Sequence, residues 1–142
     1  MSGPALTADV VALAGDPPRS VLLIQRRHDP FAGLWALPGG FVDAGERVAH
    51  AAARELAEET AIEADASQLE LLGVYDTPGR DPRGPTVSVV YLLRTGAELE
   101  ARGGDDARAA RWFAADALPA LAFDHPLVIA DALSFAAPAP RR

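Results

Sequence analysis

The sequence contains no cysteine and no lysine, and it has only one methionine and two tryptophans. Without cysteine the chain forms no disulfide, iron–sulfur cluster or thiolate zinc site, and this composition fits the reducing cytoplasm, where we expect the protein to be. No apolar run approaches the ~20 residues that a helix needs to span a bilayer, so no membrane partner is expected. Residues 1–15 have no basic residue ahead of their short apolar run, so no signal peptide is expected either.

Long regular repeats are also missing, because 12 prolines and 12 glycines interrupt the chain too often for a coiled coil. The chain is 49% hydrophobic and 23% charged, which is close to the globular average and excludes a disordered chain. Its length of 142 residues predicts one domain over residues 1–142, with a frayed, proline-rich tail at 136–142.

The charge balance is acidic, with 20 aspartates and glutamates against 13 arginines and a formal net charge of −7. A negative surface repels a phosphate backbone, so no nucleic-acid partner is expected. A small phosphorylated ligand remains compatible, because local arginines or a bound cation can invert the local field.

Apolar, partly β-branched segments alternate with turn residues and predict a mixed fold. Strands are predicted at residues 8–14, 20–26, 41–42, 68–77, 86–94 and 107–114, with an ordered loop at 28–37. Helices are predicted at 46–60, which is rich in strong helix formers, and from an Asp-His-Pro start at 124–126 to about residue 135. This order predicts an α/β (or α+β) fold in which one mixed sheet carries a helix on each face.

Four of the eight glutamates lie within the predicted helix 46–60. Glu55, Glu58 and Glu59 have i, i+3, i+4 spacing and therefore project from one helix face, in the last turn, where the helix dipole disfavours negative charge. A sequence that violates a local rule in this way is a candidate functional site. Mg²⁺ prefers oxygen ligands and binds carboxylates together with substrate phosphates, so the cluster predicts a cation site. The alternative is a solvated acidic helix face.

Arg54 can partly neutralise the cluster by pairing with Glu58 or with Glu46.

The Pro-Gly-Gly segment before this helix predicts a tight backbone feature. Gly39 and Gly40 are placed where a positive φ or a close approach of another group is needed.

Residues 40–62 resemble the signature of the Nudix hydrolases, Gly-x5-Glu-x7-Arg-Glu-(apolar)-x-Glu-Glu-x-Gly-(apolar). The positions that match are Gly40, Glu46, Arg54, Glu55, Leu56, Glu58, Glu59 and Ile62. The flanking ALPGGFVDAGE is also typical of the family, and the resemblance implies its α/β/α sandwich. One position departs, because Ala61 stands where the signature has glycine. If the helix ends there in a left-handed conformation, alanine costs roughly 1 kcal/mol, but the change removes no metal ligand.

The resemblance implies Mg²⁺- or Mn²⁺-dependent hydrolysis of a nucleoside diphosphate linked to another group. By similarity Glu58 and Glu59 are metal ligands, Glu55 is a ligand or the base that accepts the water proton, and the carbonyl of Gly39 or Gly40 completes the metal shell. Arg54 and Glu46 are orienting partners, and we count Arg54 with Glu55 and Glu58 in the catalytic group. A further acid from a late loop often assists in the family. Asp105 and Asp106 are the candidates, with Asp106 as the expected ligand, and the alternative for both is a polar loop.

The later segments resemble the branch of the family that acts on ADP-ribose and related dinucleotides. Arg80 and Arg83 are expected to reach a second phosphate or a terminal ribose, although an exposed loop is the alternative for each. Phe31 and Trp35 are candidates for stacking on the base, as is Tyr75, with core or lid packing as the alternative. The histidines are expected to be surface or capping residues; they are His28, His50 and His125.

Two other functions remain open at this stage. They are a MutT-like hydrolysis of oxidised nucleoside triphosphates and a non-catalytic nucleotide-sensing module. Relatives are often homodimers, so a second copy of the chain is also an expected partner.

Overall fold

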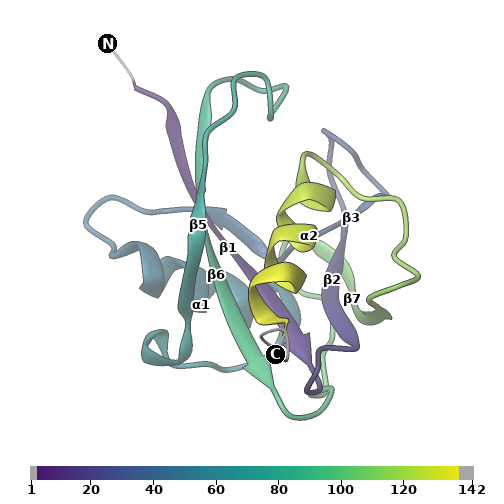
Figure 1. The fold of residues 1–142 in the computed structure, drawn as a ribbon. Helices are drawn as coiled ribbons and strands as arrows, with labels where there is room; N and C mark the ends of the chain where they lie inside the picture. Colours follow the sequence, from purple (N-terminus) through teal and green to yellow (C-terminus); the bar gives the residue numbers. More distant parts are fainter. Residues whose placement is uncertain (1–2, 138–142) are drawn as a thin grey trace.

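In the computed structural model, which describes residues 3–137, helices α1 (Val48–Thr60) and α2 (His125–Ala136) lie on opposite faces of a seven-stranded mixed sheet (Figure 1). The strands are β1 (Ala5–Ala14), β2 (Ser20–Arg26), β3 (Trp35–Ala36), β4 (Gly39–Phe41), β5 (Glu70–Tyr75), β6 (Thr86–Thr95) and β7 (Ala107–Ala114). A short 3-10 helix, η1 (Ala66–Gln68), follows α1. The predicted sandwich, with one helix on each face of a mixed sheet, is confirmed.

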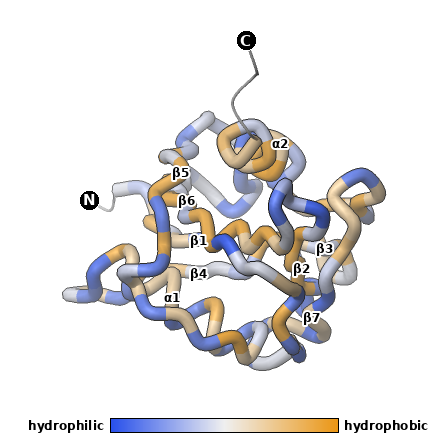
Figure 2. The backbone as a smooth tube through the Cα atoms, turned by 60° about the horizontal axis from the view of Figure 1, so that its bottom comes forward, coloured by the Kyte–Doolittle hydropathy of each residue, from blue (hydrophilic) through white to orange (hydrophobic). Residues whose placement is uncertain are grey.

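Strand β1 lies at the centre of the sheet, whose order is β3-β2-β1-β6-β5, with β4 paired to β1 and β7 paired to β2. It runs parallel to β6 and antiparallel to β2 and β4. Side chains alternate along a strand, so the two faces of β1 serve two cores. Figure 2 shows the apolar sheet between the two helices. Towards α1 the contacts join Ala8, Val10 and Ala12 to Ala51, Ala52 and Leu56, and towards α2 they join Val11 and Leu13 to Val128 and Ile129.

Several element boundaries differ from the sequence-based prediction; β1, for example, begins at Ala5 rather than at residue 8. Helix α1 begins at Val48 rather than at Glu46, because Glu46 is part of the preceding turn, where its backbone N–H donates to the carbonyl of Asp43. The loop at 28–37 contains the short strand β3, and β5 is shorter at both ends than predicted. The glycines at 39 and 40 have no positive φ; they lie in β4 and permit close approach instead.

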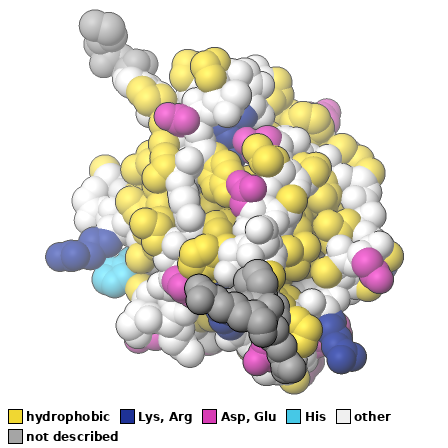
Figure 3. Space-filling model, in the orientation of Figure 1, with side chains coloured by type: hydrophobic (Ala, Val, Ile, Leu, Met, Phe, Trp, Pro, Cys, Tyr) yellow, Lys and Arg dark blue, Asp and Glu magenta, His cyan; other side chains and the backbone are white. Residues whose placement is uncertain are grey.

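The surface that carries α2 and the edge strand β5 shows many hydrophobic side chains (Figure 3). About half of the side chain is exposed at Leu71 and Val74 of β5 and at Leu127 and Phe135 of α2. Within the described part of the chain, no helix is both long enough and apolar enough to cross a membrane. Of the predicted tail, Ala136 is the last residue of α2, and residues 138–142 lie outside the described residues.

The end of α1 has the left-handed conformation that the missing glycine predicts. Ala61 has φ 64° and ψ 8°, and its N–H donates to the carbonyl of Ala57. We expect Ala61→Gly to increase the free energy of unfolding by about 1 kcal/mol, because glycine adopts this conformation without a Cβ penalty. The melting temperature, measured by circular dichroism, should increase by about 3–5 °C. Ala57→Gly, within the helix, is the control and should lower it; an unchanged melting temperature for Ala61→Gly would contradict the expectation.

Candidate active site

A cavity of about 440 Å³ opens beside the C-terminal half of α1, the strand β4, the loop at 76–85 and the N-terminus of α2. Its volume lies within the range of about 300–1,000 Å³ that small-molecule sites occupy. The charged residues that line it are Asp9, Arg26, Arg27, Asp29, Asp43, Glu55, Glu59, Arg80, Asp81, Arg83 and Asp106.

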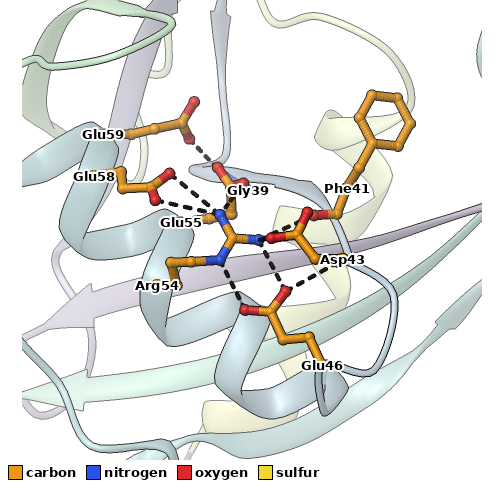
Figure 4. A network of polar contacts seen from close by, with 8 residues as sticks. All are labelled: Gly39, Phe41, Asp43, Glu46, Arg54, Glu55, Glu58 and Glu59. Carbon is orange, nitrogen blue, oxygen red and sulfur yellow. Dashed lines mark hydrogen bonds and ion pairs between the residues drawn. The ribbon is translucent and has the colours of Figure 1, made fainter.

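Arg54 stands at the centre of the acidic cluster (Figure 4). Its Nε and Nη2 donate to both carboxylate oxygens of Glu46, at 2.8 and 3.0 Å. Its Nη1 donates to Glu55 at 2.8 Å and to Glu58 at 3.2 Å, and its Nη2 also donates to the carbonyl of Phe41. The hydrogen bond from Arg54 lowers the pKa of Glu46 to about 2. The structure therefore contains both of the pairings that the sequence left open, with Glu58 and with Glu46.

The three glutamates of the cluster differ in burial. Glu55 and Glu59 are buried and line the cavity, and Glu59 accepts a hydrogen bond of 2.8 Å from the N–H of Gly39. Burial raises the pKa of Glu55 and raises that of Glu59 to about 8. The side chain of Glu58 is 40% exposed, does not line the cavity and is joined to Glu55 through Arg54.

Strand β4 brings two acidic side chains close to the backbone. A Cβ at Gly40 would lie 2.6 Å from the carboxyl group of Glu55, and a Cβ at Gly39 would collide with the carboxyl group of Asp9. Because successive strand residues face opposite sides, Asp9 and Glu55 approach β4 from opposite sides. Glycine is required at both positions for these close approaches.

The donor set suits a hard divalent cation. Seven carboxyl groups and four guanidinium groups line the cavity, so an anionic diphosphate needs an added positive charge to enter. The buried carboxyl groups of Glu55 and Glu59, whose pKa values burial raises, would be stabilised as anions by a cation. In the conformation described for residues 3–137, no three acidic or histidine side chains converge on one point, because Glu55 and Glu58 face Arg54. The residue types fit an oxygen-coordinated ion.

Of the two late-loop acids, the structure brings Asp106 to the cavity and not Asp105. The loop that carries both acids packs closely against the end of α1. A Cβ at Gly104 of this loop would lie 2.6 Å from the carbonyl oxygen of Glu58. Asp106 is exposed, and its carboxylate lies 3.7 Å from Nε2 of His28. Asp106 therefore lies at the cavity, in a loop that packs against the end of α1, and its role as a ligand stays a prediction.

The two predicted substrate arginines both line the cavity but are bound differently. The side chain of Arg80 is only 5% exposed and donates to both carboxylate oxygens of Asp124, at 2.7 and 2.9 Å, and to Ser88 Oγ. Three of its five N–H donors are thus used within the protein, and its position is fixed by Asp124. Arg83 is held by Asp81 at 2.8 Å, but 44% of its side chain is exposed.

The aromatic residues at the cavity are not the predicted ones. Trp35 packs edge-on against Phe113 in the core, and Tyr75 donates its hydroxyl to Asp131, so neither side chain lines the cavity. Phe31 does not line the cavity; its ring packs edge-on against that of Phe123, with 4.9 Å between the ring centroids.

Phe41 and Phe123 line the cavity instead. The centroids of their rings lie 5.3 and 5.7 Å from Cζ of Arg83. Phe41 could have been found from the sequence, since it directly follows Gly40.

His125 is buried at the cavity rather than at the surface, which corrects the sequence-based expectation. Its Nδ1 accepts a hydrogen bond of 3.0 Å from the N–H of Leu37, which lies just before the Gly39–Gly40 pair. Asp124 does not cap α2 with its side chain, because that side chain is bound to Arg80. His125 and Asp124 thus connect α2 to two other walls of the cavity.

The burial of His125 predicts a pH-dependent stability. Burial lowers the pKa of His125 to about 4 from its ordinary value of 6.5, so on acidification the unfolded chain binds this proton first. The contribution of His125 to the free energy of unfolding should therefore decrease by about 3 kcal/mol as the pH falls from 6.5 to 4. Urea unfolding of the wild type and of His125→Gln at several pH values isolates this contribution of His125 to the free energy of unfolding. The two stability curves should converge towards pH 4, whereas parallel curves would contradict the prediction. His50→Gln, at an exposed position, is the matched control.

Comparisons with known proteins agree with this geometry. A model of the NUDIX domain family matches residues 3–132. The chain is 46% identical over 129 residues to the ADP-ribose pyrophosphatase of Methanocaldococcus jannaschii, a match that covers 90% of this chain and 72% of that protein.

Solved structures are similar as well. The NUDIX domain of Shewanella oneidensis NrtR, in complex with ADP ribose, has a TM-score of 0.85 and 33% identity, covering 95% of this chain and 90% of that one. A bifunctional NMN adenylyltransferase/ADP ribose pyrophosphatase from Francisella tularensis, complexed with AMP and a manganese ion, has a TM-score of 0.82 and 31% identity. That match covers 96% of this chain but only 43% of the Francisella chain. The acidic helix face beside a glycine strand and the family match over residues 3–132 show that the chain belongs to the NUDIX family and is a Nudix pyrophosphohydrolase.

Proposed function

We propose that the protein hydrolyses the pyrophosphate bond of ADP-ribose or a closely related dinucleotide, with Mg²⁺ or Mn²⁺ as cofactor. The observation that carries this proposal is the placement of Glu55 and Glu59, buried beside the Gly39–Gly40 strand at a cavity of about 440 Å³. The similarity to the archaeal ADP-ribose pyrophosphatase and to a domain that binds ADP ribose supports this choice of substrate.

The cation would be held by carboxylates of the cluster together with a backbone carbonyl; the candidates are Gly40, Glu55, Glu58, Glu59 and Asp106. When bound, the ion neutralises phosphate oxygens and makes a water molecule a better nucleophile. Arg54 donates to one oxygen of Glu55 at 2.8 Å and so fixes the orientation of this carboxylate, which lines the cavity. Glu55 accepts the proton of the attacking water. Its burial raises its pKa towards the range in which a general base works best.

The reaction balances without a further reactant. The water oxygen forms a bond to one phosphorus, the bond from that phosphorus to the bridging oxygen breaks, and ADP-ribose yields AMP and ribose 5-phosphate. Arg83, which lines the cavity and has a partly exposed side chain, would interact with the phosphates. Phe41, half-exposed at the cavity, offers a ring on which an adenine base stacks.

The test is a substrate panel with identification of the products by chromatography and mass spectrometry. ADP-ribose, reduced nicotinamide adenine dinucleotide and 8-oxo-dGTP are each incubated with Mg²⁺, with Mn²⁺ and with a chelator. We expect AMP and ribose 5-phosphate from ADP-ribose, and only when a cation is present. Faster hydrolysis of 8-oxo-dGTP would replace the proposal with sanitation of oxidised nucleotides. Binding of ADP-ribose without turnover would identify a sensing module.

A further inference from the structure

The sheet face that α2 covers changes from apolar to polar along two neighbouring strands. Val11 and Leu13 of β1 pack with Val90 and Leu92 of β6 beneath α2. The preceding positions on the same face are polar, and all four of them are buried and line the cavity: Thr7, Asp9, Thr86 and Ser88. We call these four residues the polar floor. Burying polar side chains is unfavourable unless they form hydrogen bonds, so the floor is not explained by core packing.

Hydrogen bonds hold most of the floor in place. Thr7 pairs with Ser88 directly across the parallel strands, with their hydroxyl oxygens 2.5 Å apart. Arg80 donates to Ser88 Oγ and is itself fixed by Asp124. Thr86 donates its hydroxyl to the carbonyl of Gly84 at 3.0 Å. The floor is therefore a preorganised surface whose hydroxyl groups have defined positions.

Asp9 is the exception within the floor. Its side chain is buried, with the residue only 7% exposed, yet no hydrogen bond reaches its carboxyl group from any residue in the range 3–137. A carboxylate has room for several donors, and leaving it without any is costly in a buried site. Since Asp9 lines the cavity and no fully buried side-chain oxygen within residues 3–137 lacks a partner, its free acceptor positions open to the cavity, where a bound ligand can supply donors. Burial raises the pKa of Asp9 to about 7, as expected for a carboxyl group without donors.

The chemistry of this ligand follows from what surrounds Asp9. A phosphate would be repelled by the carboxylate, and a flat base finds its aromatic partners at Phe41 and Phe123 instead. Asp9 approaches β4 on the side opposite to Glu55, so it extends the polar floor and not the acidic cluster. Vicinal hydroxyl groups supply two donors for one carboxylate and can also accept from, or donate to, serine and threonine hydroxyls.

We propose that Asp9, Thr7 and Ser88 form a subsite for the vicinal hydroxyl groups of a ribose, which makes the enzyme selective for substrates with an intact ribose diol. This proposal rests on the proposed function, because it assigns one part of the same substrate. The diol can belong to the nucleoside or to the distal ribose, and the two product halves separate these sources.

The test measures binding of the product halves by NMR titration, which does not depend on turnover. The probes are ribose 5-phosphate and AMP, each compared with its 2-deoxy counterpart. We expect the wild type to bind one of the two at least 10-fold more tightly than the deoxy compound, which identifies the source of the diol. Asp9→Asn should weaken binding of that ribose compound about 10- to 100-fold and leave the deoxy compound unchanged, because one charge-assisted hydrogen bond contributes this much. Thr7→Val should show a smaller effect of the same kind.

The matched control is Asp131→Asn, which makes the same exchange at an exposed carboxylate of α2 outside the cavity, and its affinities should equal those of the wild type. Thermal unfolding checks the fold of Asp9→Asn, whose melting temperature should not decrease, since a buried charge is removed. No discrimination between ribose and deoxyribose by the wild type, or an equal loss for both in Asp9→Asn, would overturn the proposal. A tenfold increase, in Asp9→Asn, of the Mg²⁺ concentration needed for half-maximal hydrolysis of ADP-ribose would place Asp9 at the cation. This result would also overturn the proposal. If the wild type hydrolyses no ADP-ribose, the proposed function fails, while the binding data still decide the ribose subsite.

Discussion

Glu58→Gln is expected to lower kcat for ADP-ribose by about three orders of magnitude while the protein remains folded, and Glu55→Gln is expected to do the same. The two variants test different environments. The side chain of Glu58 is 40% exposed, and within residues 3–137 its carboxylate accepts hydrogen bonds from Arg54 alone, so its replacement should hardly change the free energy of unfolding. A neutral amide cannot supply the negative charge that a divalent cation requires.

Glu55→Gln is the more demanding of the two tests, because Glu55 is buried at the cavity and lies close to Gly40. Glutamine keeps the size and the acceptor oxygen that faces Arg54, but it cannot accept a proton from water. Loss of activity at preserved stability would therefore report chemistry rather than packing.

The measurement is steady-state hydrolysis of ADP-ribose over a range of Mg²⁺ concentrations, together with thermal unfolding. Glu63→Gln is the matched control, since Glu63 is exposed and lies just beyond α1, and it should retain the wild-type rate. Near wild-type rates for both Glu55→Gln and Glu58→Gln would contradict the assigned roles, whatever the substrate.

The sequence predicts the acidic cluster because its members are close together along one helix. Spacing within α1 is sufficient to group Glu55, Glu58 and Glu59, and the motif extends this to Arg54 and Glu46. The order of strands and helices also follows from local patterns, which is why β2 and β7 have the predicted boundaries. These features need no information about how distant segments meet.

The opposite wall of the cavity could not be predicted in this way. His125 meets Leu37, 88 positions away, and Arg80 meets Asp124, 44 positions away, so neither contact has a local signal. Its ring makes Trp35 a stacking candidate from the sequence, but in the fold this ring packs against Phe113, a contact that has no local signal. Asp9 does carry a local signal, since it interrupts an apolar run at the centre of the sheet.

Arg54→Ala should reduce activity about 10- to 100-fold, because side chains that orient metal ligands contribute this much in other metal sites. Arg54 is the shared donor of Glu46, Glu55 and Glu58, and it also holds the carbonyl of Phe41 next to Gly40. Without it, the carboxylates repel one another and the turn before α1 loses its attachment to the helix. We expect the Mg²⁺ concentration for half-maximal rate to change as well as kcat.

Arg54→Lys distinguishes geometry from charge. An ammonium group keeps the positive charge but lacks the planar fork that donates to both oxygens of Glu46 and still reaches Glu55. The lysine variant should therefore recover only part of the activity lost in Arg54→Ala. Arg47→Ala is the control, because Arg47 is the N-cap residue of α1, is exposed and makes no side-chain cap hydrogen bond. Full activity in Arg54→Lys would show that only the charge matters, and an unchanged Mg²⁺ requirement in Arg54→Ala would show that Arg54 does not orient the ligands.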